Sequence, residues 1–400
     1  MARELLLEMA RENLAHVKAG DIPLADEVVE VPAEHYYDEA RWKLEVERVF
    51  KRMPLMLAMT CELPNPGDYK AMDAAHVPVI ISRGQDGKVR GFANICSHRG
   101  SQILPVGTGN AKRFSCPYHA WTYNDQGELV AILSDHEFGE IDRACHRLPE
   151  LPTYEIAGLI WVTLDTASPL DTSDFLCGFD ALLARFGFDT WHFFDSRRIE
   201  GPNWKIAYDG YMDLYHLPVL HRNTFGPQMS NQAIYRAFGP HQRVSSPNPL
   251  LLEFEDKPDD EWDEATMLMS VWTIFPHVSI ASFDGGGRGV MISQLFPGDT
   301  PSTSYTVQNY LMEKPPSEAQ IPLANEQFKL LEYVVREEDY ATGIRQQKAL
   351  ETGLKKTVMF GRNEAGGQCF HAWLDKLLHT DDRDLPQLFQ QELMNDHQAL

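Results

Sequence analysis

Hydrophobic and polar positions change their period along the chain, and these changes divide it into zones. At the start, Leu5, Met9 and Leu14 recur at helical spacing among charged positions, which predicts an amphipathic helix. Between about residues 50 and 165, short apolar runs alternate with turn residues, which predicts a small all-β module. The chain therefore opens with a polar helical segment and continues into strands.

The remainder of the chain mixes helical and strand periods. Helical patterns at 179–186 and 204–217 precede a block of alternating apolar runs at 266–312, which predicts an antiparallel sheet. Helical patterns return at 317–350 and 370–378. The predicted fold class is α+β, with an N-terminal all-β domain and a C-terminal domain whose antiparallel sheet is flanked by helices.

Domain boundaries are predicted where the period changes. A length of 400 residues is typical of two domains. We expect residues 1–45 to form a helical segment that packs on the C-terminal domain. Residues 46–165 are predicted to form the all-β domain, and residues 166–400 the C-terminal domain.

Composition narrows the choice of partners. The chain has 36 Lys and Arg residues against 58 Asp and Glu, a formal net charge of −22, which disfavours binding to nucleic acid or to anionic membrane surfaces. Acidic residues interrupt the first apolar pattern, and no run reaches the ~18 apolar residues of a spanning helix. We expect a soluble, cytoplasmic protein. Its six cysteines are too few for a disulfide scaffold, so they are expected to be free thiols or metal ligands.

Two short Cys–His pairs form the first candidate metal-binding motif. Cys96 lies two residues before His98, and Cys116 lies three residues before His119. A structural zinc site is one interpretation, because zinc accepts two cysteines and two histidines. Zinc fingers usually place both cysteines before both histidines, however, and here each pair is mixed. The order favours a [2Fe-2S] cluster in which the cysteines bind one iron and the histidines bind the other.

A second constellation follows in the C-terminal zone. Asp213 and His216 are three residues apart and share one face of a helix. His221 is five residues further on, so it reaches the same metal only if the helix breaks, and Pro218 is predicted to bend or end the helix there. Two histidines and a carboxylate are the facial triad of mononuclear Fe(II). The alternative is that these histidines are partly buried residues with ordinary hydrogen bonds.

These motifs resemble those of a known family. CSHRG at 96–100, CPYHAW at 116–121, NWK at 203–205 and the segment 213–221 resemble the Rieske non-haem iron oxygenases, specifically their ring-hydroxylating oxygenase (alpha) subunits. The resemblance implies a [2Fe-2S] cluster held by both Cys–His pairs. It also implies a helix-grip-like C-terminal domain and an Fe²⁺ ion held by His216 and His221.

The resemblance further implies a late carboxylate ligand and a ring-shaped assembly. The third iron ligand is expected on a helix after the predicted sheet, where Asp339 is the best match and Glu338 the runner-up, beside Glu337. By its position, Asp213 is not a ligand but links His216 to a Rieske histidine of the neighbouring subunit. The implied assembly is a head-to-tail homotrimer, with a β subunit as an open possibility.

The function that the resemblance implies is that of a terminal oxygenase component. Electrons from NAD(P)H would arrive through a separate reductase, a ferredoxin or both, because the sequence shows no flavin or dinucleotide fingerprint. With O₂, the enzyme would hydroxylate, dihydroxylate or oxidatively dealkylate a small aromatic substrate, as in aromatic hydrocarbon catabolism. Two alternatives stay open. One is an N-demethylating or hydroxylating monooxygenase of an amine or quaternary ammonium compound, and the other is a Rieske electron-transfer protein without oxygenase activity.

A substrate pocket is predicted beside the iron ligands. The residues expected to line it are close to those ligands in sequence: Asp209, Met212, Phe225 and Met229. Residues 277–283 and 291–295 of the predicted sheet are expected to form the opposite wall. The carboxylate of Asp209 would favour a cationic or hydrogen-bond-donating substrate.

Overall fold

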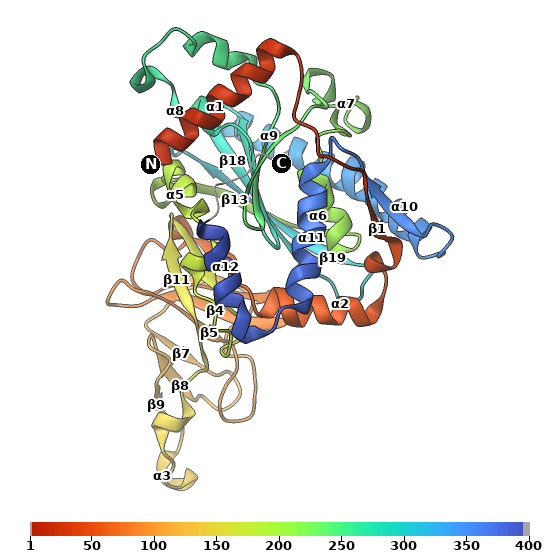
Figure 1. Ribbon diagram of the computed structural model, residues 1–400. Helices are drawn as coiled ribbons and strands as arrows, with labels where there is room; N and C mark the ends of the chain where they lie inside the picture. The colour runs from red at the N-terminus through yellow and green to blue at the C-terminus, as the bar shows by residue number, and fades with distance from the viewer. Residues whose placement is uncertain (1, 395–400) are drawn as a thin grey trace.

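Two β-rich regions form the computed structural model, which describes residues 2–394 (Figure 1). The first region, coloured orange to yellow, occupies one end of the molecule, with the short helix α3 (Asp135–Phe138) at its tip. The second region, green to cyan, contains a large sheet against which the longer helices pack. The α+β class predicted from the sequence is confirmed.

The first region contains three antiparallel sheets. The strands of the five-stranded sheet, in spatial order, are β10 (Glu150–Leu151), β5 (Val89–Ala93), β4 (Val77–Arg83), β3 (Asp68–Ala74) and β6 (Gly107–Asn110). The second sheet consists of β11 (Thr153–Ile156), β12 (Leu159–Val162) and β2 (Leu55–Met59). The third consists of β7 (Arg113–Ser115), β8 (Thr122–Asn124) and β9 (Leu129–Ala131). The loops after β5 and β7 carry the two Cys–His pairs.

The second region is built on a seven-stranded antiparallel sheet. Its strands, in spatial order, are β13 (His192–Gly201), β19 (Ser304–Met312), β18 (Arg288–Pro297), β17 (Val278–Asp284), β16 (Val271–Ile274), β15 (His241–Ser245) and β14 (Ile234–Phe238). Strands β16 to β19 are the meander that the alternating pattern predicts. The pattern missed β13, β14 and β15, because charged residues interrupt their alternation.

Helices cover this sheet and position the site. The helices that matter for the site are α6 (Trp204–Met212), α7 (Leu217–Leu220), α9 (Ile321–Tyr333), α10 (Ala341–Leu350) and α11 (Ala365–His379). Helix α6 contacts β16, β18 and β19, and α11 contacts α6 on its other side (Figure 1). The remaining α-helices are α1 (Ala2–Ala19), α2 (Glu39–Glu45), α4 (Thr172–Phe175), α5 (Phe179–Leu183), α8 (Glu264–Leu268) and α12 (Leu385–Met394).

The long helix predicted at 317–350 is interrupted. A π-helical segment, η10 (Val334–Tyr340), separates α9 from α10 and contains the acidic run 337–339. Such wide turns inside helices occur frequently at functional sites, because they change the direction in which neighbouring side chains project. The sequence pattern did not reveal this turn, since both helical forms bury the same apolar face.

The N-terminal segment packs against the second region. Strand β1 (Val29–Pro32) pairs with β20 (Thr357–Phe360), and α1 contacts α5 and α8. A short 3₁₀ helix, η1 (Ala33–Tyr36), leads into α2. The division into segments 1–45, 46–165 and 166–400 itself stays a prediction.

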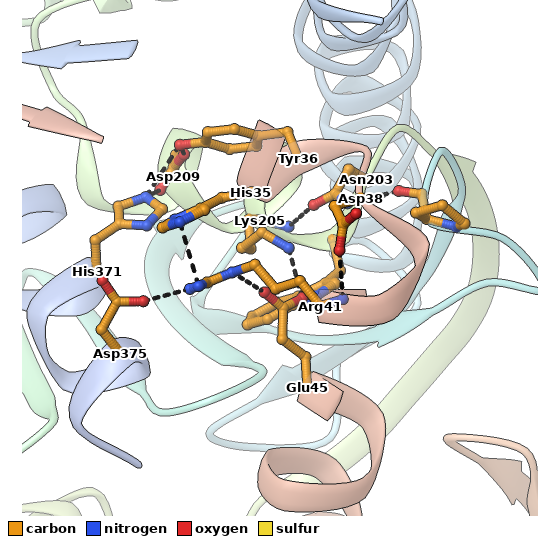
Figure 2. A network of polar contacts seen from close by, with 12 residues as sticks. His35, Tyr36, Asp38, Arg41, Glu45, Asn203, Lys205, Asp209, His371 and Asp375 are labelled. Atoms are coloured by element: carbon orange, nitrogen blue, oxygen red, sulfur yellow. Dashed lines mark hydrogen bonds and ion pairs between the residues drawn. The ribbon is translucent and has the colours of Figure 1, made fainter. Parts of the chain in front are cut away.

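A buried ion pair ties the N-terminal segment to α6 (Figure 2). The side chains of Glu45 and Lys205 are fully buried, and their charged atoms lie 2.5 Å apart. Glu45 also accepts hydrogen bonds from the indole nitrogen of Trp204 and from Arg41. Removing either charge would leave the other uncompensated in the interior, so the pair holds α2 and α6 in register.

Candidate functional site

The two Cys–His loops share one backbone design. The N–H of Gly100 donates to the carbonyl of Cys96 at 2.9 Å, and the N–H of Ala120 donates to the carbonyl of Cys116 at the same distance. Both donors have left-handed backbones, with φ of 74° at Gly100 and 56° at Ala120. Each loop therefore turns back on its own cysteine. Glycine accepts this conformation without strain, whereas Ala120 adopts it at a steric cost.

The two cysteines of these loops are buried more deeply than the two histidines. Cys96 and Cys116 are 2% and 4% exposed within the core of the first region, whereas His98 and His119 are half-buried. The two imidazole rings lie 4.7 Å apart, centroid to centroid. Thiols inside and imidazoles outside suit a group with chemically different ends, as a Rieske [2Fe-2S] cluster has.

Aromatic side chains, some of them outside the Cys–His motifs, surround the cluster site. The hydroxyl of Tyr123 lies 3.4 Å from the sulfur of Cys96. Burial, followed by this contact, raises the pKa of Tyr123 to about 12, so the phenol stays protonated beside the sulfur. Hydrogen bonds to ligand sulfurs are one means of adjusting the reduction potential. Trp121 stacks on His98 at 4.9 Å, and Phe138 of α3 packs edge-on against the same ring.

The second constellation converges on one point. Donor atoms of His216, His221 and Asp339 all lie within 4.8 Å of one another. The carboxylate of Asp339 is 3.2 Å from Nε2 of His221 and 3.7 Å from Nε2 of His216. Both imidazoles thus present the same ring nitrogen to the same carboxylate oxygen. The donor set fits a mononuclear iron with open positions, so the structure contains a candidate His–His–Asp iron site.

The chain break that brings the histidines together differs from the predicted one. Helix α6 ends at Met212, and Asp213 is extended, with its carboxylate accepting from the N–H of Tyr215. Pro218 lies in the first turn of the new helix α7 rather than ending the old one. Proline favours such a position because the first turn needs no donor from it, and the aspartate provides the turn.

Each histidine has a carboxylate behind it. Nδ1 of His216 lies 2.9 Å from Asp213, and Nδ1 of His221 lies 2.7 Å from Glu338, which also accepts from the hydroxyl of Thr224. With the proton held at Nδ1, Nε2 of each ring is free to bind metal. The alternative that Glu338 is the iron carboxylate therefore fits the geometry less well than Asp339 does.

Burial and charge act in opposite directions on His221. Burial lowers its pKa, but hydrogen bonds and charge from Asp339 and Glu338 outweigh it, so the net shift is upward. Glu338 and Asp339 are adjacent in sequence, yet both reach this one imidazole. The π-helical turn that contains them makes this possible.

A cavity of about 260 Å³ lies beside the candidate iron site. It is lined by Pro202, Ile206, Ala207, Asp209, Gly210, Met212, Asp213, His216, Leu220, Asp339, Tyr340, Thr342, Gly343, Gln346, Val358, Met359, Phe360, Glu364 and Gly367. Two predicted pocket residues, Asp209 and Met212, belong to this lining. Phe225 instead packs its ring against His221, and Met229 is exposed; neither belongs to the described lining.

The opposite wall of the cavity is not the one predicted. Helix α10, β20 and the start of α11 form it, whereas residues 277–283 and 291–295 do not line it. Residues of these two segments pack into the core instead: His277 and Met291 are 1% and 3% exposed. The N-terminal strand β1 places β20 over the site, a long-range pairing that sequence periodicity does not report.

The cavity is acidic. Its lining contains four carboxylates, those of Asp209, Asp213, Asp339 and Glu364, and no lysine or arginine among the described residues. Burial raises the pKa of Glu364, and the charges of Asp213 and Asp209 raise it further. Two of the four carboxylates belong to the histidine sites, which leaves Asp209 and Glu364 without a role there.

The fold and both sites define the class of protein. Residues 53–154 match the Rieske [2Fe-2S] domain family, and residues 188–380 match the ring hydroxylating alpha subunit (catalytic domain). The chain belongs to the Rieske non-haem iron oxygenases, as an alpha-type oxygenase subunit.

Curated relatives divide between two chemistries. The chain is 31% identical over 206 residues to the glycine betaine monooxygenase oxygenase subunit of Chromohalobacter salexigens, covering 51% of this chain and 44% of the relative. It is 26% identical over 298 residues to the anthranilate 1,2-dioxygenase large subunit of Acinetobacter baylyi, covering 72% of this chain and 59% of the relative. The matches thus span about half the length of these relatives.

Solved structures show the same fold. The quaternary ammonium Rieske monooxygenase CntA, in complex with γ-butyrobetaine, superposes with a TM-score of 0.73 at 21% identity, covering 88% of this chain and 95% of that one. Naphthalene 1,2-dioxygenase from Rhodococcus sp., bound to indole, gives 0.69 at 19% identity, covering 94% and 99%. Within residues 2–394, no helix has the length and apolar character needed to cross a membrane.

Proposed function

We propose that this protein is the terminal oxygenase component of a multicomponent system, supplied with electrons from NAD(P)H by a separate reductase, ferredoxin or both. The observation that carries the proposal is that one chain holds both a buried-thiol, outward-imidazole loop pair and a convergent His–His–Asp site. Cys96, Cys116, His98 and His119 would hold the cluster. When bound, the cluster takes up electrons from the partner, and the iron uses them to activate dioxygen.

The chain's own residues prepare the iron site. His216 and Asp339 line the cavity, and His221 lies beside them, which leaves the remaining space for dioxygen and a small substrate. Asp213 and Glu338 hold the protons of the two imidazoles at Nδ1, so that both Nε2 atoms face the metal position. The protein thus supplies orientation and a shaped cavity, and the metal supplies the redox chemistry.

Electron delivery is proposed to occur between subunits of a head-to-tail homotrimer. The loops that carry the cluster residues and helix α7 lie at opposite ends of the molecule (Figure 1). Asp213 holds His216 and is 27% exposed, so its carboxylate is available to accept a hydrogen bond from a cluster histidine of a neighbouring subunit. A short hydrogen-bonded link would replace the long route within one chain.

The substrate we propose first is a small aromatic compound. Similarity to the anthranilate and naphthalene dioxygenases supports it. A specific observation favours a second candidate, an amine or quaternary ammonium compound. Asp209 and Glu364 present carboxylates to a cavity whose described lining has no basic residue, an environment that favours positive charge. Similarity to glycine betaine monooxygenase is consistent with this candidate.

Metal analysis tests the proposed class. The oxygenase is expected to contain three irons and two sulfides per chain. Two irons with two sulfides would instead indicate an electron carrier, and zinc without sulfide would indicate a zinc-stabilised protein. For the substrate, purified protein with NADH and a surrogate reductase should be given anthranilate, indole, glycine betaine and L-carnitine separately. Mass spectrometry of the products distinguishes aromatic oxidation from oxidation of a cation.

A further inference from the structure

Two of the four carboxylates that line the candidate iron cavity serve the histidine site. Asp339 belongs to the candidate iron site, and one oxygen of Asp213 lies 2.9 Å from Nδ1 of His216. The other oxygen of Asp213 accepts from the N–H of Tyr215. The two positive charges of an Fe²⁺ ion would balance these two carboxylates, so this side of the cavity needs no further cation.

Asp209, the third carboxylate, has a partner for each of its oxygens (Figure 2). The hydroxyl of Tyr36 donates to one oxygen at 2.8 Å, and Nε2 of His371 lies 3.0 Å from the other. Both partners are buried side chains from other parts of the chain, η1 and α11. Asp209 therefore adds negative charge to the cavity, but its oxygens are already hydrogen-bonded to the protein.

The two oxygens of Glu364, the fourth carboxylate, are not equivalent. Glu364 is the N-cap residue of α11, a position from which side chains commonly accept from the first N–H groups of the helix, but its side chain makes no such bond. Oε2 instead accepts from the N–H of Gly361 at 2.7 Å. No described residue forms a hydrogen bond or an ion pair with Oε1. The half-buried side chain is thus held at one oxygen, and the other oxygen is available to a molecule in the cavity.

No basic side chain of the described lining neutralises Glu364. The nearest basic residue in sequence, Arg362, donates to the carbonyl of Ala25 at 2.5 Å instead. Burial, followed by the charges of Asp213 and Asp209, raises the pKa of Glu364, which is the direction expected of a carboxylate without a cationic partner. The cavity therefore has an excess of negative charge on the side of Glu364, even when the charge of an iron ion is counted.

We propose that Glu364 binds the positive charge of the substrate, and that this substrate is a net cation rather than a betaine. The inference rests on the proposed oxygenase function and narrows its substrate to a compound with one positive charge, on an aliphatic or an aromatic frame. Glu364 is the specificity-determining residue, because Oε1 is the carboxylate oxygen that a substrate can approach without displacing a partner within the protein.

A betaine fits this cavity less well than a simple cation. It carries a carboxylate in addition to its ammonium group, and the described lining offers no lysine or arginine to that carboxylate. The negative charges of Asp209 and Glu364 would repel it, so the same groups that attract a cation discriminate against a zwitterion. The expected substrate therefore differs from glycine betaine, the compound named for one relative.

Ligands that differ mainly in charge test the proposal. Choline and glycine betaine share a trimethylammonium group, and only glycine betaine adds a carboxylate. In 3,3-dimethylbutan-1-ol a carbon replaces the nitrogen of choline, so the molecule is neutral. The pair 2-phenylethylamine and 2-phenylethanol makes the same comparison on an aromatic frame. Isothermal titration calorimetry on the metal-loaded protein gives the dissociation constants.

The wild type is expected to bind each cation about 10-fold more tightly than its neutral counterpart, because a charge pair is strong where water is partly excluded. Choline should also bind about 10-fold more tightly than glycine betaine. A preference for the cation in either pair supports the proposal. Absence of that preference in both pairs, or binding of glycine betaine as tight as that of choline, would overturn it.

Variants of Glu364 test the residue itself. Glu364→Gln removes the charge but keeps an oxygen that can accept from Gly361, so the preference for cations should fall about 10-fold while the neutral alcohols bind as before. Glu364→Asp retains the charge and should retain the preference. Asp375→Asn is the matched control: it removes one negative charge from the same helix, but Asp375 pairs with Arg41 and lines a different cavity, so the preference should stay. A preference that survives in Glu364→Gln would assign the recognition to another group and overturn the role of Glu364.

Metal analysis of the same samples separates this inference from the proposed function. If the protein contains three irons and two sulfides per chain and does not discriminate by charge, the inference fails and the oxygenase function stands. If the protein discriminates by charge but contains only two irons, or zinc without sulfide, the oxygenase function fails instead.

Discussion

The two metal regions are assembled on different scales. All four proposed donors of the cluster site lie within residues 96–119, on two loops that fold back on their own cysteines. The donors of the iron site span residues 216–339, and they meet because α7 and the π-helical turn η10 are brought together by the large sheet. The first site depends on short loops, and the second depends on the whole C-terminal fold.

The two sites also differ in the side chains that contact their histidines. Each imidazole of the iron site has a carboxylate behind it, Asp213 for His216 and Glu338 for His221. At the cluster site, the described partners of His98 are instead aromatic rings, those of Trp121 and Phe138. Carboxylates fix the ring nitrogens that face an iron with open positions, whereas aromatic rings restrict water around a closed cluster. Substitutions should therefore affect one metal without the other.

Loss of the cluster is expected to have the largest effect. Cys116→Ser removes one of the two proposed thiolate ligands of the cluster. Iron should fall from three to one per chain, the visible absorbance should disappear, and turnover with a reductase should become undetectable. Metal and sulfide analysis checks this. Retention of sulfide at the wild-type level would show that Cys116 is not a cluster ligand.

Loss of the third iron ligand should remove the mononuclear iron and leave the cluster in place. Asp339→Ala is expected to lower iron from three to two per chain and abolish turnover, while the cluster spectrum stays. Glu338→Gln is the neighbouring comparison: as an outer partner it should keep the ligand set and weaken iron affinity by about 10–100-fold. Titration of iron into metal-depleted protein separates the two. If Glu338→Gln loses the iron and Asp339→Ala keeps it, the assignment is reversed.

Asp213→Ala should slow electron transfer to the iron site more than it changes the metal content of the protein. Both metals are expected to remain, because Asp213 contributes no donor atom to the His216–His221–Asp339 group. Turnover should fall by about 10–100-fold, since His216 loses the carboxylate that orients it and the proposed link to the next subunit disappears. Reduction of the cluster by the reductase should keep its wild-type rate. An equal loss in cluster reduction would place Asp213 elsewhere in the electron route.

The smallest effect concerns acid stability of the catalytic region. Burial lowers the pKa of His277 to about 3, and neither ring nitrogen has a partner among the described residues. The folded protein keeps this ring neutral, whereas the unfolded chain protonates it below pH 6.5. The contribution of the neutral ring to the free energy of unfolding is therefore complete above pH 6.5 and is lost as the pH falls towards 3. At pH 5 the loss is about 2 kcal/mol. His277→Leu should therefore reduce the difference between unfolding free energies at pH 7 and pH 5, measured by denaturant titration. An unchanged difference would contradict this account.

Much of the cluster site could be predicted from sequence because its chemistry is local. The spacing of the two Cys–His pairs is that of short turns, and turn geometry depends on a few residues. Tyr123 and Phe138 escaped prediction, because a tyrosine on a strand and a phenylalanine on a distant helix carry no motif of their own. Their contact with the cluster loops depends on how the third sheet and α3 fold over them.

The iron site was predictable in part. His216 and His221 follow from a recognisable segment, and Asp339 from a resemblance, but the break between the histidines was placed at Pro218 rather than at Asp213. Glu338 was weighed as a ligand, whereas the structure places it behind His221. Periodicity distinguishes buried from exposed faces, but it does not report a π-helical turn or a turn closed by one aspartate.

By itself, the amino-acid sequence determined the α+β class and the two metal chemistries, and it indicated the proposed donors, because these depend on residue type, short spacing and family resemblance. The tertiary structure alone decided which walls enclose the cavity and which groups stand behind it. Strand β1 pairs with β20, and Tyr36, Asp209 and His371 meet, although they are far apart in the chain. Such contacts depend on packing of the whole molecule, and no local pattern encodes them.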